Sequence, residues 1–201
     1  GGTPVAKSTY SLQAKAQTVQ EKMGTRHVKL VFRDITSKKL AYVDYGAIPL
    51  AVVEIKDTLE AYHPELSPDG KWVAFCTGIE GVSGQSSVYV RRLDAAGSDL
   101  ARLDVESAAI PRWKVLDSGD TVIVYVTSAA NNRDAAVFKA ASTWQVKFSD
   151  GKFGIPEKLF DGAYHGGISE DNSLAVTGAR LFRVRKAGGS PSDSVQEETW
   201  Y

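Results

Sequence analysis

The chain has 201 residues, of which 43% are hydrophobic and 24% are charged, as is typical of a soluble globular protein. Its 24 Lys and Arg residues balance its 24 Asp and Glu residues, so the zero formal net charge gives no electrostatic reason to expect a nucleic-acid partner. Cys76 is the only cysteine, which excludes an intrachain disulfide and argues against a cysteine-based metal site. No apolar run approaches the ~20 residues of a membrane-spanning helix, so we expect no membrane span.

Residues 1–27 are predicted to form an N-terminal arm. Good helix formers fill positions 8–23, Ser8 or Thr9 can cap a helix there, and Gly24 can end it. The segment has few apolar positions, so two alternatives stay open, a short solvated helix and a disordered arm.

From residue 28 onward, the pattern changes to short strands. Runs rich in β-branched and aromatic residues alternate with turn formers, which favours β-strands. The first three expected strands are His27–Arg33, Leu40–Tyr45 and Pro49–Ile55.

A recurring segment indicates the fold class. Tyr62–Phe75, which reads YHPELSPDGKWVAF, returns in degenerate form at Tyr164–Val176, and a weaker copy lies at Ile110–Tyr125. His63 and His165 are 102 positions apart, or about 51 for each of two units. A period of roughly 40–50 residues with short strands is typical of β-propeller blades. We therefore predict an all-β, propeller-like fold.

We expect about three complete blades and one partial blade within residues 28–201. The approximate blade limits are 28–58, 60–106, 107–161 and 162–201. In the first blade, the inner strand is expected to be either missing or unrecognisable from the sequence. Tight turns are expected at Ser67–Gly70 and Ser149–Lys152. Closed propellers contain four to eight blades, so the chain is either a minimal propeller or a piece of a longer one. An uncovered sheet edge would invite pairing with another chain.

The expected strands after residue 60 are Tyr62–Leu66, Lys71–Thr77, Ser87–Leu93, Leu100–Val105, Ala109–Lys114, Thr121–Thr127, Thr143–Phe148, Glu157–Phe160, Leu174–Gly178, Ala179–Lys186 and Val195–Tyr201.

Leu66–Phe75, followed by Val88–Leu93, resembles the TolB-like propeller repeat, a Pro-Asp relative of the WD repeat. Ile168–Val176 resembles a further copy, with Glu170 in place of the proline. The resemblance covers roughly residues 60–185. The wider run is also similar to bacterial cell-envelope lipoproteins in which such repeats accompany a domain resembling the formylglycine-generating enzyme. The resemblance implies a scaffold that binds proteins in the bacterial cell envelope, periplasmic or outer-membrane-associated, or secreted.

Other TolB-like propellers cap the active sites of serine peptidases of the prolyl oligopeptidase kind. This sequence shows no Gly-x-Ser-x-Gly nucleophile motif.

His63 and His165 occupy equivalent repeat positions, and Glu65 and Arg112 lie on strands expected to line the central channel. Residues two apart on a strand point to one face, so these four side chains could form a channel mouth that binds a peptide terminus or a small anion. Alternatively, each histidine hydrogen-bonds the neighbouring blade. We favour this second interpretation, because repeat-equivalent residues usually serve the repeat.

The four tryptophans divide by context. Trp72 and Trp113 lie in apolar strands and are expected to pack between blades, whereas Trp144 and Trp200 are candidate aromatic contacts to a ligand. Cys76 lies in an apolar run and is expected to be a buried structural thiol. The three histidines show no metal-binding spacing, so we expect neither a metal nor a cofactor.

The leading hypothesis is a non-enzymatic propeller module that binds a protein partner or assembles with copies of itself. A carbohydrate-binding or carbohydrate-active propeller is the first alternative. The second is the substrate-gating domain of a larger hydrolase.

Overall fold

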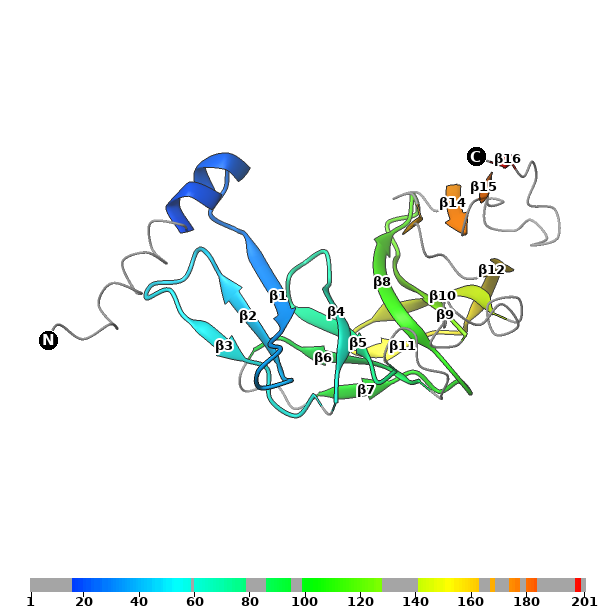
Figure 1. Cartoon of the computed structure of the whole chain (residues 1–201), viewed down its shortest axis with the longest axis horizontal. Coiled ribbons are helices and arrows are strands. Elements are labelled where there is room, and N and C mark those ends of the chain that lie inside the picture. Colours follow the sequence, from blue (N-terminus) through cyan, green and yellow to red (C-terminus); the bar gives the residue numbers. More distant parts are fainter. Residues whose placement is uncertain are drawn as a thin grey trace, which may run out of the picture.

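The computed structural model describes residues 16–58, 60–78, 86–94, 99–127 and 141–162, together with the backbone of short strands at 167–168, 174–177, 180–183 and 198–199. These residues form four antiparallel sheets that follow one another in chain order, and the series does not close into a ring (Figure 1). One sheet has three strands and the other three have four or five. The predicted all-β, propeller-like fold is confirmed, with three complete blades and one partial blade.

The first sheet contains β1 (Lys29–Arg33), β2 (Leu40–Asp44) and β3 (Val52–Glu54) in that order. β1 lies against β4, the first strand of the second sheet. The Lys29 ammonium donates a hydrogen bond to the carbonyl of Gly70 at 3.0 Å, and the Arg33 guanidinium lies 4.5 Å from the centre of the Tyr62 ring. β1 therefore holds the inner position. Of the two alternatives, the inner strand is thus present, and the sequence does not mark it as an inner strand. Within the described part, the strand that the first sheet lacks is the outer, fourth one.

The second and third sheets each begin with a strand that contacts the preceding sheet. The second has the order β4 (Tyr62–Leu66), β5 (Trp72–Cys76), β6 (Val88–Arg92) and β7 (Leu100–Arg102). The third contains β8 (Ala109–Val115), β9 (Thr121–Val126) and β10 (Ser142–Ser149), with β11 (Lys152–Phe153) and β12 (Glu157–Asp161) both on the far side of β10. The fourth contains β13 (Gly167–Ile168), β14 (Leu174–Thr177), β15 (Arg180–Arg183) and β16 (Glu198–Thr199).

The N-terminal arm includes a helix whose described part is residues 16–23. Gly24 has a φ of 67°, the left-handed conformation in which glycine commonly ends a helix. The Gln20 amide donates a hydrogen bond to the carbonyl of Tyr45, which fixes the helix at the end of β2.

Two hydrophobic clusters join the first three sheets. Val73 and Phe75 face the first sheet, whereas Ala74 and Val90 face the third, and all four side chains are fully buried. Alternate residues of a strand point to opposite faces, so a sheet covered on both sides needs apolar residues at every position. This explains the continuous apolar run of β5.

Candidate functional site

His63 and its repeat equivalent Ile110 share a backbone feature. Both have a φ of 51°, and the pairing of β4 with β5 and of β8 with β9 is irregular at these points. A β-branched residue rarely adopts this left-handed conformation, so the surrounding sheet must hold Ile110 there. Histidine and isoleucine differ chemically, so the two repeats do not share a side-chain function at this position. What they share is the left-handed backbone conformation, which bends the inner strand.

Glu65 connects the second sheet to the third. Its carboxylate accepts a hydrogen bond from the backbone N–H of Trp113 at 3.2 Å, and its carbonyl accepts one from the Trp113 indole N–H at 2.9 Å. Burial raises the pKa of the Glu65 carboxyl, and this effect outweighs the opposing influence of the Arg112 guanidinium and of the Trp113 N–H. The Arg112 guanidinium is thus near Glu65, and the Glu65 carboxylate links the second sheet to the third.

The other predicted site residues are distributed as follows. Arg112 is exposed on β8, and His63 is partly buried on β4. Trp144 is partly buried on β10, packs against the larger hydrophobic cluster and donates its indole N–H to the Ser142 hydroxyl at 2.8 Å. His165 and Trp200 lie outside the described residues.

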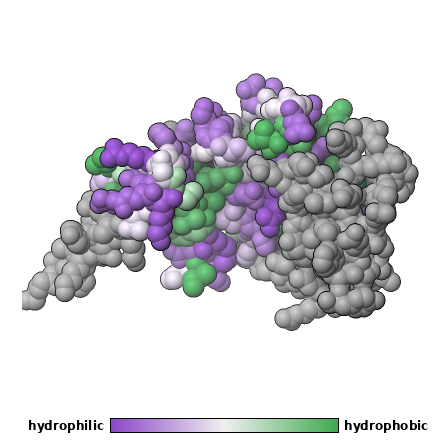
Figure 2. Space-filling model, turned by 90° about the horizontal axis from the view of Figure 1, so that it is seen from above, coloured by the Kyte–Doolittle hydropathy of each residue, from purple (hydrophilic) through white to green (hydrophobic). Residues whose placement is uncertain are grey.

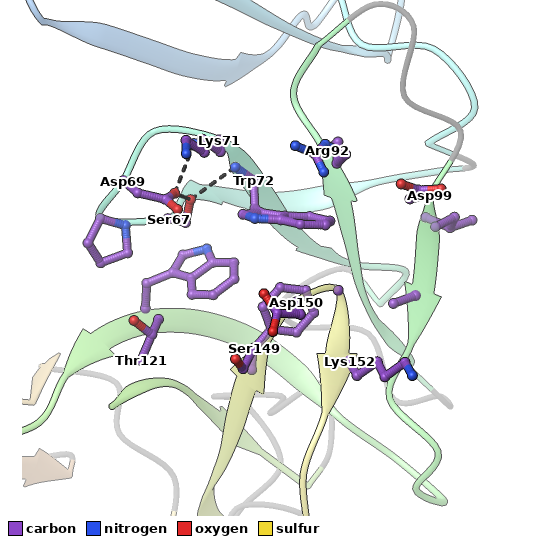
Figure 3. Close-up of a pocket in the computed structure, with 16 residues that line it drawn as sticks. Ser67, Asp69, Lys71, Trp72, Arg92, Asp99, Thr121, Ser149, Asp150 and Lys152 are labelled. Atoms are coloured by element: carbon purple, nitrogen blue, oxygen red, sulfur yellow. Dashed lines mark hydrogen bonds between the residues drawn. The ribbon is translucent and has the colours of Figure 1, made fainter. Parts of the chain in front are cut away.

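A groove of about 800 Å³ lies where the second sheet meets the third. In Figure 3 it runs from Ser67, Asp69 and Thr121 at one end to Asp99 and Lys152 at the other. One wall is formed by the β4–β5 turn and the ends of β5, β6 and β7, and the other by β8, β9 and the β10–β11 turn. Its volume falls within the range of ~300–1,000 Å³ that is common for ligand sites.

Trp72 lies at the centre of this groove. The Arg92 guanidinium lies 5.0 Å from the centre of the indole, and the Phe148 ring of the third sheet meets the indole edge-on at 5.1 Å. Gly151 has a φ of 78°, and a Cβ at this position would lie 3.4 Å from the far edge of the indole. The β10–β11 turn can therefore approach Trp72 closely because it carries glycine there.

The β4–β5 turn is held by its own side chains. The Ser67 hydroxyl donates to the Asp69 carboxylate at 2.6 Å and accepts the backbone N–H of Trp72 at 2.9 Å, while Gly70 N–H donates to the Ser67 carbonyl at 2.9 Å. Burial alone would raise the pKa of Asp69, but hydrogen bonds from Ser67 and from the Lys71 N–H keep it below its usual value. The carboxylate is thus fixed at the inner end of the groove.

The groove carries both signs of charge in equal number. Its lining includes three carboxylates and three cations, namely Asp69, Asp99, Asp150, Lys71, Arg92 and Lys152. A balanced rim of this kind favours a zwitterionic ligand over a polyanion, because a polyanion needs a positive field.

Sequence reasoning missed this groove although it recognised both turns that border it. Ser67–Gly70 and Ser149–Lys152 are about 80 positions apart, and the sequence holds no signal that they meet. The expected position of Trp72 and Trp113 between sheets is confirmed, since Trp72 meets Phe148 of the third sheet and the Trp113 indole donates to the Glu65 carbonyl of the second. The expected burial of Cys76 is also confirmed.

The described residues contain neither a cluster of metal-ligating side chains nor a membrane-spanning helix. No group of three His, Cys, Asp or Glu side chains in this part of the chain is arranged to hold a metal ion. Nor does any helix in the same residues have the length and apolarity to cross a membrane.

Comparison with solved structures supports the fold. The chain is similar to a puromycin-hydrolysing peptidase of Mycobacterium tuberculosis, with 18% identity and a TM-score of 0.51 over 84% of this chain and 28% of that chain. It is also similar to TolB from Acinetobacter baumannii, with 16% identity and a TM-score of 0.36 over 87% of this chain and 44% of that chain. The chain thus spans less than half the length of either protein, and at 18% identity the likeness to the peptidase concerns the fold alone. No family model matches the chain, and no curated protein matches it by sequence.

Proposed function

We propose that this chain is a non-enzymatic propeller module that binds a short segment of a protein partner in the groove between its second and third sheets. The observation that carries the proposal is the pairing of Trp72 with Arg92 at the centre of a groove whose rim has equal numbers of both charges. An aromatic ring and a guanidinium offer contact area and hydrogen bonds together, and both residue types are enriched where proteins bind one another.

The outer end of the groove supports an extended peptide as the ligand. β7 pairs with β6 through Val90 and Ala101, and Leu103 N–H donates to the Val88 carbonyl at 2.9 Å. Hydrogen bonding alternates along an antiparallel strand, so the backbone groups of Leu100 point away from β6. They are placed to pair with a partner strand, as in β-strand addition.

Two serines near the groove and the third sheet have structural roles that fit a binding module. Ser67 is committed to its turn, and the Ser142 hydroxyl accepts the indole N–H of Trp144. The bacterial envelope location and the kinship with envelope lipoproteins belong to the same proposal, and the resemblance of the repeat to TolB-like propellers supports them.

Selection from a random dodecapeptide phage library against the immobilised chain tests the proposal. We expect enriched peptides whose affinity for Arg92→Gln and Lys152→Ala falls by ~10-fold or more, because Arg92 lies beside Trp72 and Lys152 is one of the charged residues that line the groove. Lys56→Ala removes an exposed lysine outside the groove and is the matched control, which should bind like the wild type. No enrichment, or binding that ignores the groove variants, would contradict the proposal. Binding on a glycan array in place of peptides would support the carbohydrate alternative.

One observation favours a second function, the substrate-gating domain of a larger hydrolase. The match to the peptidase covers 84% of this chain but only 28% of the peptidase, as it would if the chain were one part of a longer enzyme. An immunoblot of the source organism with antibody against this chain distinguishes the two. A polypeptide several times longer than 201 residues that cleaves peptide substrates would support gating, and a product without hydrolase activity would not.

A further inference from the structure

The groove between the second and third sheets offers a ligand charge more than apolar surface. Eight large hydrophobic side chains are exposed in the described part of the chain, and of these eight only Leu100 lines the groove. Figure 2 shows hydrophobic residues, in green, in separate patches between hydrophilic ones on one face of the molecule. Apolar contact is therefore available in several places, so selectivity for the groove has to come from the charged side chains that line it.

Arg92 is the groove cation that lies against another side chain of the lining. Its guanidinium lies 5.0 Å from the centre of the Trp72 indole, and the arginine side chain is 41% exposed. The other two cations, Lys71 and Lys152, are exposed residues next to the turns that border the groove. A guanidinium that stacks on an aromatic ring keeps its N–H groups in one plane, in the arrangement that matches the two oxygens of a carboxylate.

The carboxylates near Arg92 leave most of these N–H groups unused. The Asp94 carboxylate lies 3.8 Å from the Arg92 Nε atom, which is beyond hydrogen-bond distance. Arg91 pairs with Leu100, so the next position of the register places Asp99 opposite Arg92. Figure 3 shows these two side chains on neighbouring strands, but within the described residues no ion pair joins them. In the same residues, neither terminal nitrogen of Arg92 has a hydrogen-bond partner.

The remaining charges of the groove limit how much negative charge a ligand can bring. Asp69, Asp99 and Asp150 all belong to the lining, and they would repel a run of acidic residues. A single carboxylate can lie beside Arg92 and still leave the total charge of the groove and its ligand close to balance. The chemistry of the lining therefore fits one carboxylate in an otherwise neutral or mixed-charge peptide.

We propose that Arg92 selects the peptide ligand by one carboxylate, which binds in the plane of the guanidinium through two parallel hydrogen bonds. The neighbouring part of the peptide packs on the Trp72 indole. This inference rests on the proposed function, peptide binding in the groove, and names the chemical group that the groove recognises. Such a carboxylate is supplied by an Asp or Glu side chain or by a peptide C-terminus.

A double-mutant cycle with soluble copies of the selected dodecapeptides tests the inference. Either replacement of one Asp or Glu by its amide or amidation of the C-terminus should lower affinity for the wild type by about 10-fold or more. The first result assigns the carboxylate to a side chain, and the second assigns it to the C-terminus. The same change should lower affinity for Arg92→Gln by less than about 3-fold, because the partner is already absent.

Arg92→Lys separates the shape of the guanidinium from its charge. A lysine keeps the positive charge but cannot donate two parallel hydrogen bonds, so this variant should lose nearly as much affinity as Arg92→Gln. Arg102→Gln is the matched control and should bind like the wild type. Arg102 lies on β7 of the same sheet, is 47% exposed and does not line the groove.

Circular dichroism verifies that each variant is folded, and the cycle is run with Arg92→Lys should Arg92→Gln fail to fold. Equal losses of affinity for the wild type and Arg92→Gln on removal of the carboxylate would overturn the inference. So would an Arg92→Lys variant that binds as tightly as the wild type. In either case, weaker binding to Lys152→Ala would still support the groove as the peptide site, so failure of this inference is distinguishable from failure of the proposed function.

Discussion

Phe148 of the third sheet meets Trp72 of the second sheet, and its contacts with Trp113 and Phe153 lie within the third sheet. It is 6% exposed and meets Trp72, Trp113 and Phe153 edge-on, with ring centroids 5.1, 5.5 and 5.2 Å away. Phe148→Leu keeps most of the apolar volume but removes all three ring contacts, each of which is worth about 0.5–1.5 kcal/mol. Part of this loss is regained as neighbours adjust, so we expect the free energy of unfolding to fall by about 2–3 kcal/mol.

Phe75→Leu is the matched control for this substitution. Phe75 is fully buried but, among the residues that the structure describes, makes one ring contact, a stacked pair with Tyr89 at 5.7 Å, so its loss should cost about 1 kcal/mol. Urea unfolding followed by circular dichroism measures both variants, and an unchanged dependence on urea would show that the denatured state is unaffected. If Phe148→Leu lowers the free energy of unfolding no more than Phe75→Leu does, the ring contacts of Phe148 with Trp72, Trp113 and Phe153 do not stabilise the fold as described.

Two further substitutions examine the polar links beside Trp72 and Trp113. Because burial raises the pKa of Glu65, its carboxyl stabilises the fold most at low pH and loses this contribution as the pH rises from the ordinary value of 4.5 through the folded-state pKa. The stability of Glu65→Gln relative to the wild type should therefore increase over that interval, and a constant or decreasing difference in denaturation midpoint would refute the assignment. Ser67→Ala leaves the Trp72 N–H without its hydroxyl acceptor and should cost about 1–2 kcal/mol. Ser118→Ala, in an exposed turn of the third sheet, should change stability by less than about 0.5 kcal/mol, and equal losses in calorimetry would contradict this reading.

Local chemistry explains which parts of the fold the sequence could predict. β4 was predicted at its observed limits, because the Ser-Pro-Asp-Gly turn that follows has one well-defined conformation and Gly70 adopts the positive φ it requires. Asp150 and Gly151 likewise both have positive φ, as a two-residue hairpin turn demands. Such signals act over a few residues and need no knowledge of the rest of the chain.

The position of β1 and the role of Glu65 depend on contacts between sheets. β1 lacks the turn motif that marks the other inner strands, and its inner position follows from packing against β4. The hydrogen bonds of Glu65 to Trp113 join residues 48 positions apart, and no local pattern in the sequence signals them. The groove around Trp72 arises in the same way, from two turns that only the assembled sheets bring together.

Hydrogen exchange read by mass spectrometry, with and without a peptide selected from the library, tests the central claim most directly. Peptide binding in the groove should slow exchange in the segments that line it, residues 67–72, 99–101 and 149–152. The first sheet, at residues 29–54, is the internal reference and should exchange at the same rate in both states. Protection of the three groove segments alone is the predicted result. Protection confined to other segments, or none at all with the peptide at saturation, would contradict the account.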